Sequence, residues 1–199
     1  MSLVNAAILV IGDEILSGRT QDANVQAIAR ALGPIGIRVC EVRFVPDDRR
    51  AIISTINDLR AAHRYLFTTG GIGPTHDDIT ADAVAAAFGV SIDERADALA
   101  ILQARYSDEE LTPEGADLIA NPVSGAPGFQ LGNVFVMAGV PSIMRGMLAD
   151  VVPRLEGGAP VVAVSVRGPG LREGDFAAAL GELAAASPDL DFGSYPWFG

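Results

Sequence analysis

The first 90 residues alternate between continuous apolar runs and stretches in which apolar residues recur at helical spacing. The run at residues 6–11 predicts a strand buried on both faces, and strands are also predicted at 37–45 and 65–67. The helical spacing predicts three helices, which run from Asp22 to Gly33, from Asp47 or Asp48 past Leu59, and from Thr80 to Gly89. This alternation predicts an α/β fold, in which helices cover both faces of a mostly parallel sheet.

The rest of the chain carries weaker patterns. They predict a helix at 94–106, a loop with a short helix at 107–129, a strand at 134–137 and a helix with Pro141 in its first turn. Gly157 and Gly158 mark the clearest boundary. Beyond it we expect a strand at 161–166, a helix with Phe176, Leu180 and Leu183 on one face, and a short strand near Phe192. The expected organisation is a main domain at 4–156 and a small α/β appendage at 159–199.

Three polar segments directly follow the first three predicted strands. They are Gly12-Asp13-Glu14, Pro46-Asp47-Asp48, and the glycine-rich stretch TTGGIGPTHDDIT at 68–80. In a mostly parallel sheet, ligands bind beyond the carboxyl ends of the strands. We therefore expect the three segments to meet at one rim and to form a binding site there.

The glycine-rich stretch suits a phosphate group. Glycine adopts positive φ and lets a ligand approach the backbone, so Gly70, Gly71 and Gly73 can turn several N–H groups toward one point. The stretch matches neither G-x-x-x-x-G-K-[ST] nor G-x-G-x-x-G. A tight strand-to-helix turn is the alternative interpretation.

Carboxylates beside this stretch indicate a metal ion. Asp77 and Asp78 would repel a phosphate unless a divalent cation lay between them, and ligation by oxygen alone suits Mg²⁺. Two structural alternatives remain open. Asp78 could cap the following helix, in competition with Thr80, and either Asp47 or Asp48 could simply be a helix N-cap.

Composition narrows the class of protein. The net charge is −11, from 14 basic and 25 acidic residues, which argues against nucleic acid as a partner. No apolar run approaches the roughly 18 residues of a membrane span, so we expect a soluble protein with no membrane partner. Cys40 is the only cysteine, which excludes an intrachain disulfide and favours a cytoplasmic location. Cys40 itself is expected to be a small buried residue.

The motifs together resemble a known family. GDEIL (12–16), DAN (22–24), VPDD (45–48) and the glycine-rich stretch resemble the molybdopterin-binding proteins of molybdenum cofactor biosynthesis, the MoaB/Mog domain. Two longer segments and FGSYP (192–196) resemble the branch that contains the CinA N-terminal domain and the molybdopterin-binding-like domain of eukaryotic FAD synthase. These segments are LTPEGADLIANPVSGAPGF (111–129) and NVFVMAGVPSIMRGML (133–148).

The resemblance implies a three-layer α/β/α sandwich that assembles as a trimer or dimer and binds a pterin or nucleotide at the rim. Adenylating members transfer AMP from ATP to molybdopterin with Mg²⁺, and their two functional aspartates match Asp47 and Asp78. The CinA-like branch is linked to hydrolysis of nucleotide diphosphates such as ADP-ribose or FAD. The family's Pro-Gly-x-Pro turn reads Ala138-Gly139-Val140-Pro141 here.

The expected function is binding of a pterin phosphate or adenine nucleotide, with metal-dependent hydrolysis of a nucleotide diphosphate. Asp47 and Asp78 are the expected catalytic and metal-binding residues. The expected ligand-binding residues are Gly12, Asp13, Glu14, Thr69, Gly70, Gly71, Gly73, Pro74, Thr80, Gly139 and Pro141. Two alternatives remain: a molybdopterin adenylyltransferase, or a binding or assembly module without catalysis. A homodimer or homotrimer is expected, also because alanine-rich helices bury little area within one subunit.

Overall fold

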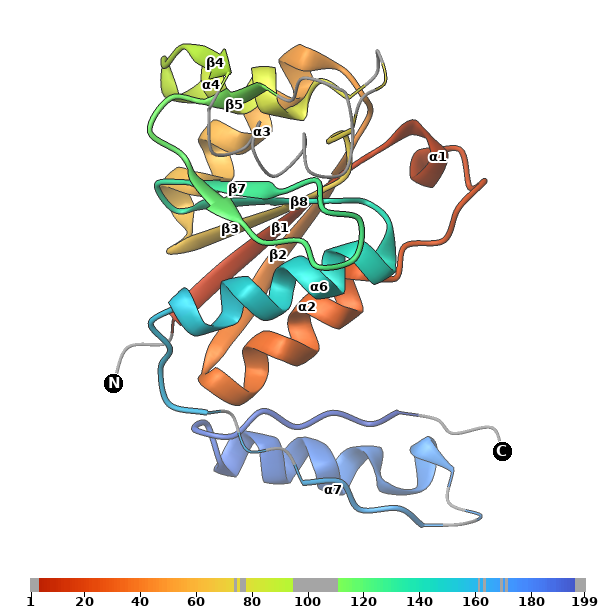
Figure 1. Cartoon of the computed structure of the whole chain (residues 1–199). Helices are drawn as coiled ribbons and strands as arrows, with labels where there is room; N and C mark the ends of the chain where they lie inside the picture. Colours follow the sequence, from red (N-terminus) through yellow and green to blue (C-terminus); the bar gives the residue numbers. More distant parts are fainter. Residues whose placement is uncertain are drawn as a thin grey trace. The chain divides into compact units, whose positions relative to one another are not determined.

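The computed structural model describes residues 4–73, 75, 78–94, 111–160, 162, 164–168, 170 and 172–195. The chain divides into two compact units, residues 1–161 and 162–199 (Figure 1). No helix in the described ranges is long and apolar enough to cross a membrane.

The first unit contains a sheet, a two-stranded ladder and five α-helices in its described part. The strands are β1 (Val4–Ile11), β2 (Ile37–Val45), β3 (Tyr65–Thr69), β4 (Ile92–Glu94), β5 (Leu111–Pro113), β6 (Asp117–Ile119), β7 (Gly128–Leu131) and β8 (Val134–Met137). The helices are α1 (Asp13–Leu16), α2 (Asn24–Leu32), α3 (Arg49–Ala62), α4 (Thr80–Phe88) and α6 (Pro141–Val151), with 3₁₀ turns η1 (Gly33–Ile35) and η2 (Val152–Arg154).

Six strands form one mixed sheet in the order β2-β1-β3-β8-β7-β6. The first four strands are parallel to one another, and the pairs β8–β7 and β7–β6 are antiparallel. The remaining two strands, β4 and β5, pair antiparallel in a separate ladder. The expected α/β fold with a mostly parallel sheet is therefore confirmed.

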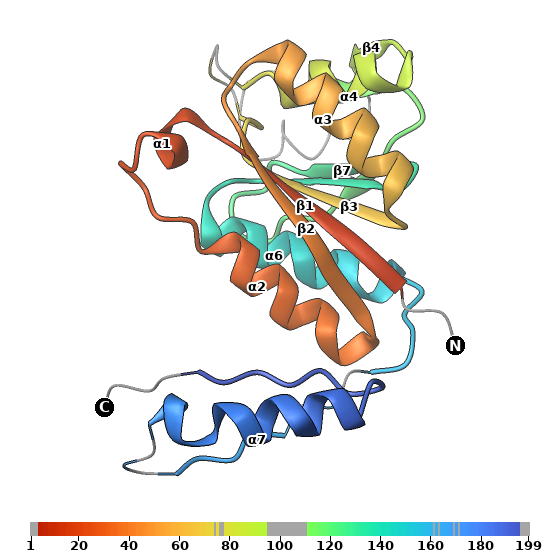
Figure 2. The same cartoon turned by 180° about the vertical axis from the view of Figure 1, so that it is seen from behind.

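Helices cover both faces of the sheet and give the expected three layers (Figures 1 and 2). Within β1, Ala7, Leu9 and Ile11 pack in the cluster under α3 and α4, whereas the alternate residues pack under α2 and α6. Since both faces of β1 are buried from Ala6 to Ile11, this part of its sequence is apolar throughout rather than alternating. Phe67 and Phe135 stack in the cluster under α2 and α6, with ring centroids 5.3 Å apart.

Two expectations for the middle of the chain need correction. The short helix expected within 107–129 is wrong for the described part, where β5, β6 and β7 lie instead. These strands have only three or four residues each, too few to show a period of two. The helix expected at 94–106 is wrong at its first residue, which ends β4, and 95–106 lie outside the described residues.

The second unit keeps its expected helix, α7 (Glu173–Ala186), but loses both expected strands. Residues 162 and 164–166 form no strand, and neither do residues 191–195. Val162, Val164 and Val166 are 85%, 85% and 95% exposed. An apolar run becomes a strand only where a neighbour completes its hydrogen-bond ladder, and the described residues of this unit contain no such strand. The described part of the appendage therefore contains one helix and no strand.

The prediction that Cys40 is buried is also wrong. The pairing of β1 with β2 shifts register here, since Ala6 faces Val39 and Ala7 faces Glu41. Cys40 is the extra residue of this irregularity and is exposed, on a strand at the edge of the sheet.

Candidate functional site

The rim of the sheet lies at the carboxyl ends of β2, β1, β3 and β8. The chain leaves β1 through α2 on one face and returns from β2 to β3 through α3 on the other face. The boundary between β1 and β3 is therefore a topological switch point, the place where open α/β sheets bind ligands. Four loops meet there, and three of them contain the polar segments expected from the sequence.

The glycine-rich loop is held to its neighbours by backbone and hydroxyl hydrogen bonds. The Gly70 amide donates to the Met137 carbonyl at 3.2 Å, which fastens the loop to β8. The Thr80 hydroxyl donates to the Gly70 carbonyl at 3.1 Å, and the Thr80 amide donates to the Gly71 carbonyl at 3.0 Å. Thr80, the first residue of α4, therefore fixes the loop conformation.

Close approach explains why two positions in this loop are glycine. Gly70 has φ +101°, and a Cβ there would lie 2.1 Å from the Ile11 carbonyl oxygen. Gly71 has φ +64°, and a Cβ there would lie 2.3 Å from the Thr80 hydroxyl oxygen. Both positions therefore combine a left-handed backbone with contacts that exclude any side chain. The loop can bring its backbone next to the end of β1 only with glycine at both.

The two neighbouring aspartates after β2 have different roles. Asp48 caps α3, since its Oδ1 accepts from the Ala51 amide at 2.8 Å. The half-buried Asp47 instead accepts with Oδ2 from the Asp13 amide at 2.9 Å. This bond draws the Asp47 carboxylate to the end of β1. The alternative that one of the pair is only a helix cap thus holds for Asp48, and Asp47 faces the rim.

We predict that Asp48→Ala lowers the free energy of unfolding by about 1 kcal/mol, the usual loss when an N-cap side chain is removed. Asp48→Asn keeps an oxygen that can accept from the Ala51 amide, so its expected change is only a few tenths of that. Urea unfolding followed by circular dichroism measures both. Equal losses for the two variants would contradict the capping role.

Asp78 closes a turn within the glycine-rich loop. Its Oδ2 accepts from the Thr75 amide at 2.9 Å and from the Thr75 hydroxyl at 2.5 Å. The carboxylate lies against Gly73, where a Cβ would be 2.7 Å from Oδ2. The alternative in which Asp78 caps α4 is not found. The N-cap position of α4 is Ile79, no side-chain hydrogen bond caps this helix, and the Asp78 carboxylate instead binds Thr75. Asp78 is therefore held beside the glycines.

The other expected site residues are distributed as follows. Gly12 lies at the end of β1, and the carboxylate of Glu14 folds back over it, 2.5 Å from where a Cβ would be. Gly139 packs on Gly70, with 3.3 Å between its Cβ position and the Gly70 Cα, and Pro141 is the first residue of α6. Thr69 is buried, and its hydroxyl has no hydrogen-bond partner. Pro74, like Asp77, lies outside the described residues.

One residue at the rim was missed by the sequence reasoning as a site residue. Asn24 begins α2, and its Nδ2 donates to the Gly139 carbonyl at 2.7 Å. The available signal was the asparagine of the DAN motif, which follows a better-placed helix cap, Asp22. Because Asp22 already supplies the cap, a second polar side chain at the helix start has no capping task and is free to bind elsewhere.

The rim carries carboxylates without a ready-made metal cage. Among the residues that the structure describes, no group of three or more His, Cys, Asp or Glu side chains is arranged to hold a metal ion. Mg²⁺ commonly binds through one or two carboxylates and completes its shell with water and substrate phosphates. The pair Asp47 and Asp78 fits that mode of binding, and it does not fit a site built from protein ligands alone.

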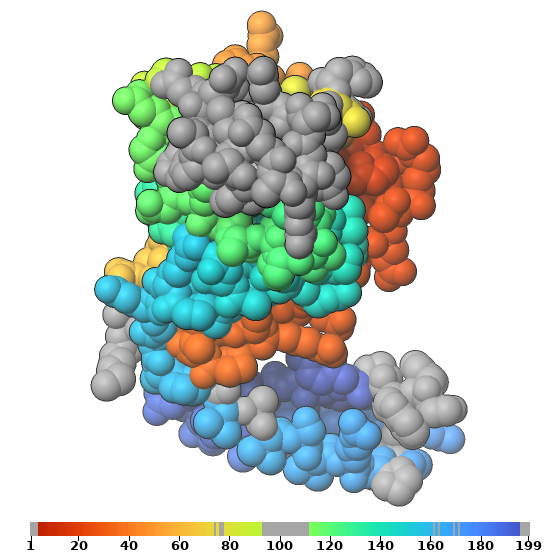
Figure 3. All heavy atoms as spheres, viewed as in Figure 1, coloured from red at the N-terminus to blue at the C-terminus, as the bar shows by residue number. Residues whose placement is uncertain are grey.

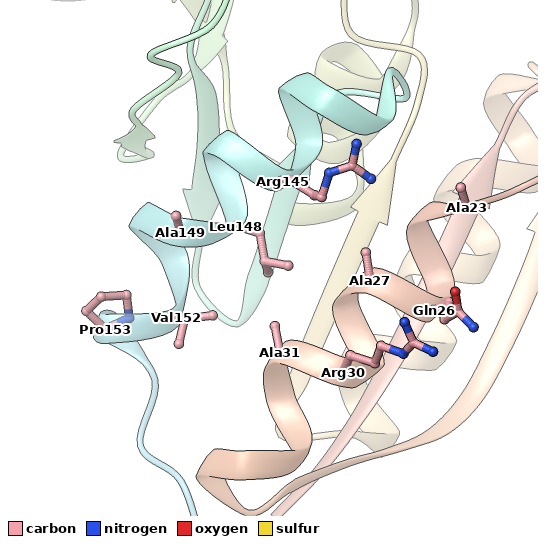
Figure 4. A pocket seen from close by; sticks show the side chains of 10 residues that line it. All are labelled: Ala23, Gln26, Ala27, Arg30, Ala31, Arg145, Leu148, Ala149, Val152 and Pro153. Atoms are coloured by element: carbon pink, nitrogen blue, oxygen red, sulfur yellow. The ribbon is translucent and has the colours of Figure 1, made fainter.

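A separate groove of about 650 Å³ lies between α2 and α6 (Figure 4). It is lined by Ala23, Gln26, Ala27, Arg30, Ala31, Arg145, Leu148, Ala149, Val152 and Pro153. None of the residues expected for the site lines this groove.

The space-filling view shows the segment around α1 standing out at the edge of the first unit (Figure 3).

Comparison with known proteins adds three findings. The family model described as "Probable molybdopterin binding domain" matches residues 7–157. Two relatives named "CinA-like protein", from Gemmatimonas aurantiaca and Citrifermentans bemidjiense, are 34% and 39% identical over 200 and 171 residues. The matches cover 89% and 77% of this chain but 47% and 41% of the relatives, so the chain spans less than half their length.

Solved structures agree with this fold. A crystal structure of the protein CinA with unknown function, from Thermoplasma acidophilum, has a TM-score of 0.71 and 29% identity, covering 77% of this chain and 99% of that one. The molybdopterin biosynthesis enzyme MoaB from Thermus thermophilus has a TM-score of 0.53 and 22% identity, covering 76% and 91%. The likeness to MoaB concerns the fold alone.

Proposed function

Because the chain belongs to the family of probable molybdopterin binding domains, we propose that its rim binds the phosphate groups of a pterin phosphate or an adenine nucleotide. One observation carries the proposal. The glycine-rich loop with Asp78 follows β3, and Asp47 follows β2 and accepts from the Asp13 amide at the end of β1, so all of them lie on loops at the carboxyl ends of neighbouring strands. Glycines that admit a close approach of backbone to ligand are what phosphate recognition requires.

Each part of the rim has a defined task in this proposal. Backbone amides of Gly71 and Gly73 would donate to phosphate oxygens, since neither residue has a side chain of its own to stand between its amide and the ligand. Thr80 keeps the loop in shape through its bonds to Gly70 and Gly71. The Asp13 amide holds Asp47, and Thr75 holds Asp78, so both carboxylates are oriented before a ligand arrives. Such pre-orientation lowers the entropic cost of binding.

Asp47 and Asp78 would hold a divalent cation between themselves and the phosphates. When bound, the cation would offset the repulsion between carboxylates and phosphate and polarise a phosphoryl oxygen. This charge balance matters because the chain is acidic overall, with a net charge of −11. Without a cation, the two carboxylates would weaken phosphate binding.

We further propose that the rim hydrolyses a nucleotide diphosphate of the ADP-ribose or FAD type. The oxygen of one water would add to a phosphorus atom, the bridging P–O bond would break, the leaving phosphate would keep the bridging oxygen, and the protons of the water would pass to the solvent. In this proposal the chain's own residues contribute positioning and electrostatics. The support for this reaction is the CinA-like identity of the relatives together with the paired carboxylates.

We predict that ADP-ribose incubated with the protein and Mg²⁺ yields AMP and ribose 5-phosphate, resolved by ³¹P NMR. Chelation of the metal is expected to stop the reaction, because the carboxylates then lack their counter-charge. A scan of ADP-ribose, FAD, ATP and pterin phosphates, each with Mg²⁺, sets the specificity. Absence of products from all of them, with binding retained, would leave the binding function and exclude hydrolysis.

The scan also separates the two alternatives. Adenylyl transfer would place AMP on an added pterin instead of in solution. A binding or assembly module would take up ligand without releasing any product. The homodimer or homotrimer stays a prediction, since the structure contains a single chain. The cytoplasmic location also stays a prediction.

A further inference from the structure

Asn24 links the start of α2 to a loop of the rim. It is only 4% exposed, and its Nδ2 donates to the carbonyl of Gly139, in the loop between β8 and α6. Gly139 in turn packs on Gly70, with 3.3 Å between its Cβ position and the Gly70 Cα. The side chain of Asn24 therefore restrains the position of Gly139 relative to the glycine-rich loop.

Only the Nδ2 group of the Asn24 amide makes a hydrogen bond. Its Oδ1 is buried and has no hydrogen-bond partner. The orientation is fixed nevertheless, because a flipped amide would place Oδ1 against the Gly139 carbonyl oxygen. A buried acceptor without a donor is unfavourable for folding. Stability alone is therefore a poor reason for an asparagine at this position.

Helix capping does not explain the residue either. The start of α2 is capped by Asp22, whose Oδ1 accepts from the Val25 amide at 3.0 Å. Asn24 makes no capping bond there, and its donor is directed at a loop far away in the sequence. What remains is its effect on Gly139 and, through it, on the glycine-rich loop.

We propose that Asn24 is a positioning residue of the rim site, which holds the Gly139 carbonyl so that Gly70 and the amides after it keep their phosphate-binding geometry. The inference rests on the proposed function. It adds a residue that contacts no ligand but acts through Gly139. Loss of the Asn24 donor should weaken ligand binding more than it weakens the fold.

The test uses two variants and a matched control. Asn24→Ala removes the donor, and Asn24→Asp replaces it with a carboxylate oxygen of the same size. Asn133 serves as control because its Nδ2 also donates to backbone carbonyls, those of Arg60 at 2.9 Å and His63 at 3.0 Å. Asn133 precedes β8, at the opposite end of the sheet from the rim. Asn133→Asp thus breaks a similar clamp far from the site.

Calorimetry with ADP-ribose and Mg²⁺ measures the dissociation constant, and thermal unfolding measures stability. At pH 8 we expect both Asn24 variants to bind about tenfold more weakly or worse, in line with a modest displacement of a positioned group. Asn133→Asp should lower the melting temperature and leave the dissociation constant unchanged.

Burial raises the pKa of the introduced carboxyl, so at pH 5 its protonated form can again donate to Gly139. Relative to wild type at the same pH, Asn24→Asp should therefore recover binding, and Asn24→Ala should not.

Two results would overturn the inference. If the Asn24 variants bind ADP-ribose like the wild type and only melt earlier, as Asn133→Asp does, Asn24 is a purely structural clamp. If the wild type binds none of ADP-ribose, FAD, ATP and pterin phosphates with Mg²⁺, the proposed function fails and the inference fails with it. Circular dichroism checks folding, and Asn24→Ser replaces any variant that does not fold.

Discussion

Gly70→Ala should weaken ligand binding at the rim roughly 100-fold and destabilise the fold. The new Cβ would lie 2.1 Å from the Ile11 carbonyl oxygen, and the backbone has φ +101°. Strain at positive φ and the forced displacement together cost roughly 2–5 kcal/mol. A loop that moves by about 1 Å loses roughly 100-fold in affinity for a ligand that needs exact geometry. Urea unfolding and calorimetry with ADP-ribose and Mg²⁺ measure the two effects.

Gly89→Ala is the matched control for this prediction. Gly89 also has positive φ, +68°, but no atom lies within 4 Å of its Cβ position. It ends α4, away from the glycine-rich loop. We expect a loss of about 1 kcal/mol from backbone strain and no change in affinity. Similar affinity losses in both variants would contradict a special role for Gly70.

Asp47→Asn is expected to remove the metal dependence of the site. Asparagine has nearly the same size and keeps an oxygen that can accept from the Asp13 amide, so the fold should be retained. The negative charge is lost, and with it the counter-charge for a divalent cation. Loss of metal-assisted stabilisation predicts that hydrolysis of ADP-ribose falls at least about 100-fold. Initial rates over a range of Mg²⁺ concentrations measure this effect.

The neighbouring carboxylate provides the control for Asp47. Asp48→Asn removes an identical charge from the next residue, but that side chain caps α3 and is exposed. We expect near-normal rates and an unchanged response to Mg²⁺. If both variants lose activity equally, the effect is one of general charge, and the assignment of the metal site to Asp47 is wrong.

Much of the fold follows from local pattern. The strands at 37–45 and 134–137 match β2 and β8. β8 is a short buried run, whereas β2 is a nine-residue edge strand in which apolar and polar residues are mixed. The parallel arrangement then places the segments after β1, β2 and β3 on one edge. The approximate position of the rim could therefore be predicted without coordinates.

Other features depend on contacts that the sequence does not display. Asp47 and Asp48 are the same residue type side by side, and only the Asp13 amide separates their roles. The bond from Asn24 to Gly139 joins residues far apart in the sequence. The run around Val164 reads as a strand, but a strand needs a partner, and the described residues of that unit offer none.

The central claim is that the rim, and not another surface, binds a phosphorylated ligand. Backbone amide chemical shifts recorded by NMR during titration with ADP-ribose and Mg²⁺ test it most directly. The account predicts saturable shifts centred on Asp13, Gly70, Gly71 and Gly73. Shifts centred on the α2–α6 groove, at residues such as Ala27 and Leu148, would contradict it, and so would the absence of any shift at millimolar ligand.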